Sequence, residues 1–342
     1  MSPLKVLAVV FVFIVGIADV HANSIERPFE KTAWEYYQML LSRQFDDLER
    51  VADESRKSNA AIGDGQPRLA ALYGGLAGCL SSGCSNRLSE EQWQERHRLL
   101  LEWRKTRPQS VTAEIAMASF FIEHAWAIRG QGYANTVKSE TWPAFRESIA
   151  AARKKLEEAG PAAKNDPGWF AAMLEAGVAQ GWPTEQFERV YKEGKLKHPL
   201  YLPLYFNASS YFAPRWYGSV SELRAFIDES VAATRSQLGE TLYARLNWSL
   251  WTRDMFRNGQ ADWGRMKAGF DRMVTDYPDP WNINNFAKFA CMAGDSRTVL
   301  ALAKKIGARP IEAAWGGSTQ YYNQCIAFAQ KSLPDGPISQ RN

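Results

Sequence analysis

Apolar residues recur every three or four positions along most of the chain, and polar residues separate them. This spacing gathers the apolar side chains on one face of an α-helix. No run of alternating β-branched residues is long enough to predict a strand. We therefore predict an all-α fold. Two of the helices begin near Ser89 and Ser110. The others span residues 29–41, 45–55, 142–159, 167–180, 184–195, 219–238, 240–256, 262–277, 282–293, 295–306 and 319–332.

The most aromatic stretch, residues 199–219, predicts a further helix that starts at Pro199 and ends at Pro214. Proline suits the first turn of a helix but cannot continue one. Ser219 lies three residues before Glu222, which is the spacing of a capping box for the next helix. The apolar face that we expect to meet the core consists of Leu200, Leu204, Ala208 and Tyr211 or Phe212.

The corner between these two helices combines Arg215 with Trp216 and Tyr217. A guanidinium beside aromatic rings either stacks on them or binds an anionic group. Bracing of the corner is the simpler interpretation, and binding is the functional one. Of the two neighbours, we expect Trp216 to serve packing and Arg215 to belong to a site.

Helix pairs of roughly 35 to 45 residues that follow one another predict a tetratricopeptide-like helical solenoid. We assign residues 89–333 to this solenoid and residues 334–342 to a flexible tail. Residues 23–88 hold a helical hairpin and a joint rich in Gly, Ser and Pro, which is typical of loops.

The N-terminus carries the pattern of a cleaved signal peptide over residues 1–22. Lys5 precedes an apolar run, and Val20-His21-Ala22 has the small residues that signal peptidase requires. An uncleaved anchor is the alternative. The pattern predicts export to the periplasm or the medium, with a mature chain that starts at Asn23 and has no transmembrane helix.

Export gives the four cysteines a role, because disulfides form in oxidising compartments. Local pairing favours Cys79–Cys84 and Cys291–Cys325 among three connectivities, and four free thiols are the alternative. No histidine lies at ligand spacing from another histidine or a cysteine, so no metal site is predicted.

Composition excludes some classes of function. The chain of 342 residues is 46% apolar and 23% charged, with a net charge of +4 and no long basic block, so nucleic-acid binding is not predicted. The glycine-rich segment 129–135 lacks the Gly-Lys-Ser/Thr ending of a P-loop and follows a predicted helix. We therefore expect no cofactor there, and we expect Tyr133 to pack on the corner after Arg129.

Four segments resemble a bacterial domain family of unknown function: Ala125-Trp126 with Arg129-Gly130, Pro214 to Ser219, Asp262-Trp263 with Gly269-Phe270, and Trp281-Asn282 with Phe286-Ala287. The resemblance covers residues 29–315. Short helix pairs and a partial Ala208, Phe212 and Pro214 pattern also resemble tetratricopeptide-like repeats, whose full consensus is missing. The family has no assigned activity, so the resemblance implies a fold only.

Polar residues beside tryptophans are the remaining candidates for binding. Capping explains Asp262 and Asn282 without any ligand. The chain nevertheless holds 13 tryptophans, and exported proteins use such rings beside polar groups to bind sugars or peptides. The candidate ligand-binding residues are Arg129, Tyr133, Arg215, Trp216, Tyr217, Asp262, Trp263, Trp281 and Asn282.

The predicted function is binding of a protein, a peptide or an envelope glycan through an aromatic-rich groove. A carbohydrate-active enzyme on a helical superhelix is the alternative, and a structural part in an envelope complex comes third. Glu54, Glu147 and Glu229 each precede serine but lack the aromatic residue two positions on that peptidoglycan-cleaving superhelices carry. No catalytic residue is therefore assigned.

Overall fold

A computed structural model describes residues 27–78, 88–130, 132 and 134–332, and this part of the chain is all-helical and free of strands. The predicted signal peptide, Cys79, Cys84, Tyr133 and the tail from residue 334 lie outside it. The first helices are α2 (Pro28–Leu41), α3 (Phe45–Ser58), α4 (Arg68–Ala77), α5 (Glu90–Thr106), α6 (Val111–Arg129), α7 (Trp142–Glu158) and α8 (Pro167–Gln180). They are followed by α9 (Thr184–Lys197), α10 (Leu202–Phe212), α11 (Val220–Leu238), α12 (Thr241–Ser249), α13 (Trp263–Asp276), α14 (Pro280–Ala293), α15 (Ser296–Ile306) and α16 (Gln320–Ser332).

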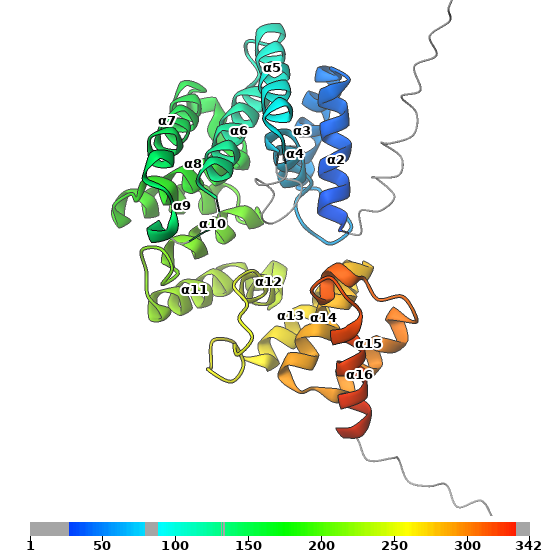
Figure 1. Ribbon diagram of the computed structural model, residues 1–342. Coiled ribbons are helices and arrows are strands. Elements are labelled where there is room, and N and C mark those ends of the chain that lie inside the picture. The colour runs from blue at the N-terminus through cyan, green and yellow to red at the C-terminus, as the bar shows by residue number, and fades with distance from the viewer. Residues whose placement is uncertain (1–26, 79–87, 131, 133, 333–342) are drawn as a thin grey trace, which may run out of the picture.

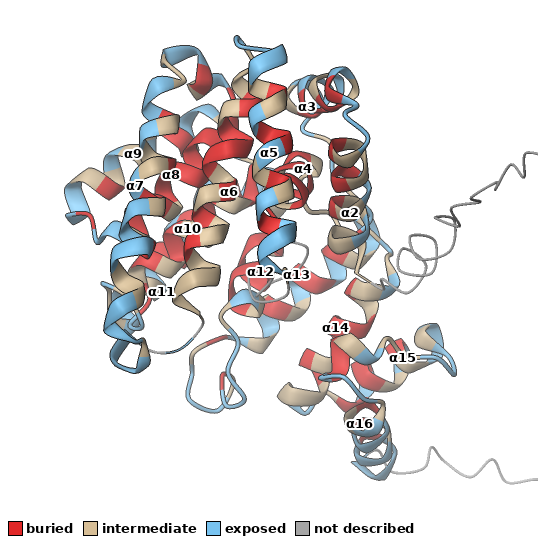
Figure 2. Cartoon of the chain, turned by 45° about the horizontal axis from the view of Figure 1, so that its top comes forward, coloured by how far each residue is buried: buried red, intermediate tan, exposed pale blue. Residues whose placement is uncertain are grey.

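Even-numbered helices form the inner layer of the arrangement. The contacts run from α4 to α6, α8, α10 and α12 in chain order, and α7, α9 and α11 each pack against the two helices that flank them in sequence. Figure 1 shows this succession from blue α2 to yellow-green α12. Figure 2 shows buried residues along α6, α8 and α10 and exposed residues along the outer faces of α5 and α11.

Capping residues begin the helices where the sequence predicts them. Ser89 and Gln92 make a reciprocal capping box at α5, and Ser219 accepts a hydrogen bond from the Glu222 amide at α11. Each bond satisfies one of the amides that the first turn of a helix leaves unpaired. The predicted caps Ser110, Asp166 and Asp262 are confirmed in the same way.

The predicted start of α10 is wrong by three residues. The helix begins at Leu202 with Pro203 in its first turn, and Pro199 lies outside it. The Pro199 carbonyl instead accepts a hydrogen bond from the Tyr205 hydroxyl at 2.7 Å. A second proline four positions on, Pro203, thus lies in the first turn, and the predicted apolar face is buried at Leu204, Ala208 and Tyr211.

The predicted joint contains a helix that the sequence analysis missed. Glycines at 74 and 75 are typical of a loop, yet both lie inside α4. A Cβ on Gly75 would lie 2.1 Å from the backbone oxygen of Ala33 in α2, so a glycine is needed for these helices to touch. Helix α12 is also shorter than predicted, since it ends at Ser249 and turns replace residues 250–256.

Helix α6 is long and apolar enough to be considered as a membrane span by length and composition. Half of the relevant stretch is buried within the protein. Its neighbours α4, α5, α7 and α8 account for that burial. A core helix passes the same test, so this observation is weak evidence for a membrane segment.

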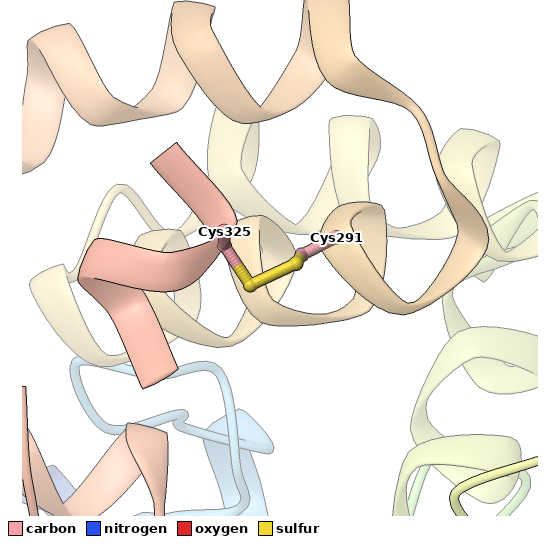
Figure 3. The surroundings of a disulfide bond; sticks show 2 residues. All are labelled: Cys291 and Cys325. Atoms are coloured by element: carbon pink, nitrogen blue, oxygen red, sulfur yellow. A yellow bond between two sulfur atoms is a disulfide. The ribbon is translucent and has the colours of Figure 1, made fainter. Parts of the chain in front are cut away.

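The predicted disulfide between Cys291 and Cys325 is confirmed. It joins α14 to α16 with the two Cα atoms 5.7 Å apart (Figure 3). This separation is within the normal range for a disulfide.

Candidate functional site

Two of the predicted segments meet at one corner of the fold. The indoles of Trp126 at the end of α6 and Trp216 after α10 are in edge-to-face contact, with ring centroids 5.7 Å apart. The guanidinium of Arg129 lies 5.3 Å from the Trp126 ring and 5.4 Å from the Trp142 ring. We call Trp126, Arg129, Trp142, Arg215 and Trp216 the Arg–Trp cluster.

Positive charge concentrates in the Arg–Trp cluster. Burial lowers the pKa of Arg129, and the charge of Arg215 lowers it further. Like charges must be close for one to disfavour the other. Arg129 also donates to the carbonyls of Gly130 and Gly132 at 3.0 and 3.1 Å, so it braces the helix end. Arg129 therefore braces the end of α6 and also places a positive charge at this corner.

Tyr217 connects this corner to α8. Its hydroxyl donates to the backbone carbonyl of Val178 at 2.8 Å, and burial followed by the neighbouring Tyr211 raises its pKa. The ring is still 48% exposed. Helices α6, α8 and α10 thus all end at this corner.

Two glutamates that the sequence analysis did not select lie near the corner. Glu123 is on α6 and Glu175 is on α8, and the two helices are in contact. Burial raises the pKa of Glu123 to about 8, with a further contribution from the charge of Glu175, and burial raises the pKa of Glu175 to about 7. Both residues are only half-buried, so part of each carboxyl group is accessible although protein surrounds it on most sides.

The Glu123–Glu175 pair makes no polar contact with the part of the chain that the structure describes. Within the described residues, no hydrogen bond or ion pair from another side chain or the backbone reaches either carboxyl group. Because neither residue is fully buried, both carboxyl groups remain open to hydrogen bonds with water or a ligand.

The pair lies one helical turn before the Arg–Trp cluster. Three residues separate Glu123 from Trp126, and three separate Glu175 from Val178. At 1.5 Å per residue, each carboxylate-bearing Cα is about 4.5 Å further along its helix axis from the corner.

One signal in the sequence could have identified the pair. Glu175 is the only ionisable residue between Pro167 and Gln180, in a helix otherwise composed of apolar and small residues and one glutamine. An isolated carboxylate in a core helix is costly unless it is paired, protonated or functional. That signal does not show which second residue it faces.

The other predicted site residues lie in the C-terminal half of the fold and have internal contacts. Asp262 caps α13 by accepting from the Arg265 amide at 2.7 Å, and the Trp263 indole donates to Asp295 at 3.2 Å. Trp281 lies under the guanidinium of Arg27 at 4.9 Å.

Asn282 is fully buried and donates to two backbone carbonyls, those of Asp64 and Tyr277. The tertiary structure therefore does not bring Asp262, Trp263, Trp281 and Asn282 to the Arg–Trp cluster. Tyr133 remains outside the described residues.

No group of three potential metal ligands among His, Cys, Asp and Glu occurs in the described part of the chain. Neither a family model nor a curated protein nor a solved structure matches the chain.

Proposed function

We propose that this protein is an exported helical-repeat protein that binds an envelope glycan at the Glu123–Glu175 pair and the adjacent Arg–Trp cluster. The observation that carries the proposal is that both carboxyl groups lack a partner in the described protein. Sugar hydroxyls donate and accept hydrogen bonds, and two carboxyl groups that share a proton do the same. The Arg–Trp cluster adds ring surface and positive charge for an acidic sugar.

The arrangement of the helices supports a solenoid of helix pairs. Each outer helix packs against its two sequence neighbours, and the inner helices continue from one pair to the next. This is the contact pattern expected of stacked repeats. The Cys291–Cys325 disulfide supports export, because such bonds persist in oxidising compartments. The apolar run and cleavage pattern of residues 1–22 support the same destination.

Cleavage of the glycan is the second candidate function, and the carboxyl pair itself favours it. Glycoside hydrolysis uses one protonated carboxyl group as the acid and one carboxylate as the nucleophile or base. Burial raises the pKa of both carboxyl groups, so one member of the pair would donate its proton to the leaving oxygen. The other carboxyl group, ionised, would attack the sugar carbon or activate water.

Co-sedimentation with purified peptidoglycan tests the binding proposal. We expect the wild-type protein to sediment and the double variant Glu123→Gln with Glu175→Gln to bind roughly tenfold or more weakly, since amides cannot accept the charge-assisted hydrogen bonds that a carboxylate accepts. Arg215→Ala should weaken binding as well. The exposed Glu147 and Arg146 on α7 supply matched controls, and Glu147→Gln and Arg146→Ala should bind normally.

Failure of the wild-type protein to sediment, or equal binding by the double variant and Glu147→Gln, would reject the glycan assignment. If the protein bound peptides but did not sediment with peptidoglycan, the ligand of this site would be a peptide. Release of soluble muropeptides by the wild-type protein, abolished in Glu123→Gln, would establish the cleaving function. Binding without release would leave the protein as a binder.

A further inference from the structure

A pocket lies in the C-terminal half, away from α6 and α8. Its volume is about 600 Å³. It is bordered by the segment after α12, by α14, by the short helix Glu312–Trp315 and by α16. The lining residues that matter below are Trp251, Arg253, Arg257, Lys288, Trp315 and Tyr321.

The charges in this pocket are mainly positive. Arg253, Arg257 and Lys288 line it, and Asp254 is the only acidic lining residue. None of the three cations forms an ion pair with any residue that the structure describes. Arg253 and Arg257 are exposed and Lys288 is half-buried, so the attraction to an anion is strengthened mainly at Lys288, where protein replaces part of the water.

Lys288 is the most constrained of these cations. Its ammonium lies 4.3 Å from the centroid of the Trp251 ring, and no side-chain hydrogen bond ties it to the described protein. Burial lowers its pKa, and the charge of Arg27 lowers it further. A partly desolvated ammonium that has only a ring for a partner is suited to an incoming anion.

The aromatic walls are held in place by the fold. The Trp315 indole donates to the side-chain oxygen of the buried Asn284 at 2.9 Å. Its ring centroid lies 5.9 Å from that of Tyr321 on α16. The Asn284 oxygen also accepts from the Ile311 amide at 3.1 Å, which fixes the segment before Trp315. Trp315 and Tyr321 are therefore held in place before any ligand binds.

The disulfide forms part of the same wall. Cys291 lines the pocket one turn after Lys288, and its bond to Cys325 holds α16, with Tyr321, against α14 (Figure 3). A pocket whose two faces are joined covalently loses little entropy when a ligand enters.

We propose that this pocket binds a small organic anion with a planar apolar body. The anionic group would lie at Lys288 with Arg253 and Arg257, and the planar body would lie between Trp251, Trp315 and Tyr321. A simple inorganic anion would leave the rings without a contact, and a neutral ring would leave the cations without one. The site is separate from the proposed glycan site and does not depend on it.

Calorimetric titration of the full-length mature protein with 1-naphthoate tests this assignment. We expect saturable binding, with the neutral 1-naphthamide and inorganic phosphate each binding roughly tenfold or more weakly. Lys288→Met keeps the apolar stem of the side chain and should weaken naphthoate binding roughly tenfold or more. The exposed Lys57 on α3 provides the control variant Lys57→Met, which should bind as the wild type does.

Arg253→Gln at an exposed position is a second variant that should fold normally and bind less tightly. Absence of saturable binding up to about 5 mM naphthoate would overturn the proposal. Equal affinity for the amide and the carboxylate would overturn the role of the cations. Unchanged binding by both Lys288→Met and Arg253→Gln would place any observed binding elsewhere.

Discussion

The backbone carbonyl of Asp64 accepts a hydrogen bond from the buried guanidinium of Arg245, although 181 positions separate the two residues. The same carbonyl accepts from Asn282 at 3.1 Å. The loop between α3 and α4 therefore contacts both α12 and α14, and the succession of helices returns to its own beginning (Figure 1). Such closure fixes the first helices against the C-terminal half.

Substitution of Gly65 tests whether the loop between α3 and α4 packs tightly against the C-terminal half. Gly65 has a positive φ of 81°, and a Cβ there would lie 2.5 Å from the Tyr277 ring and 2.7 Å from the Arg245 guanidinium. We expect Gly65→Ala to lower the free energy of unfolding by about 1 to 3 kcal/mol more than Gly160→Ala does, because overpacking adds to backbone strain.

Gly160 is the matched control, since its φ is 75° and its Cβ would meet no atom within 4 Å. Urea unfolding of both variants measures the difference. Equal losses in the two variants would show that the loop does not pack tightly against α12 and α14.

We expect Asp166 to contribute more to the free energy of unfolding than a helix cap alone does. Its carboxylate accepts from the Gly168 amide at 2.7 Å and from the Tyr73 hydroxyl at 2.6 Å, and it pairs with Arg56. We expect Asp166→Ala to cost about 2 to 4 kcal/mol, because it removes a cap and leaves the buried Tyr73 hydroxyl without its acceptor, while Arg56 keeps its ion pair with Asp53.

Asp262 caps α13 at an exposed position, so Asp262→Ala should cost only about 1 kcal/mol. Chemical unfolding of both variants gives the comparison. Similar costs would mean that the contact of Asp166 with α3 and α4 contributes little to stability.

The disulfide should stabilise the C-terminal helices. Cys291 and Cys325 are 34 residues apart, and the chain-entropy model gives a loop of this size about 3 to 4 kcal/mol. The paired variant Cys291→Ser with Cys325→Ser should lose that amount in unfolding experiments without reductant. Mass mapping of the non-reduced protein checks the bond, and detection of both thiols as free would refute it.

The Glu123–Glu175 pair predicts a dependence of stability on pH. Both carboxyl groups have a pKa in the folded protein, about 8 and about 7, above the value of 4.5 that applies to the unfolded chain. The folded state therefore binds protons more tightly, and this contribution to stability is fully present below pH 4.5 and is lost as the pH rises through about 7 and about 8. Each unit of pKa difference corresponds to about 1.4 kcal/mol.

Urea unfolding at about pH 5 and about pH 9 measures this loss. The double variant Glu123→Gln with Glu175→Gln should lose less stability across that interval than the wild type, whereas Glu147→Gln should behave as the wild type. An identical decline in the double variant would assign the pH dependence to other groups.

Local chemistry made most helices predictable from the sequence. The capping box of Ser89 and Gln92, and the caps at Ser219 and Asp262, depend on residues two or three positions away, so neighbouring residues are sufficient to determine them. Where tertiary contacts override local preference, the prediction is wrong. Gly75 is typical of a loop, yet it lies in α4 because α2 passes too close for any side chain.

The candidate site was predictable only in part. Arg129, Arg215 and Trp216 stand out in the sequence because polar and aromatic residues coincide at corners, and the structure brings them together. Helix packing, and not local sequence, brings Glu123 close to Glu175 and Arg245 to the carbonyl of Asp64. The sequence by itself therefore determined most of the helices, their caps and the local pairing of Cys291 with Cys325. The tertiary structure alone decided which distant residues meet, because apolar stripes on successive helices are compatible with many packings, and long-range contacts select one.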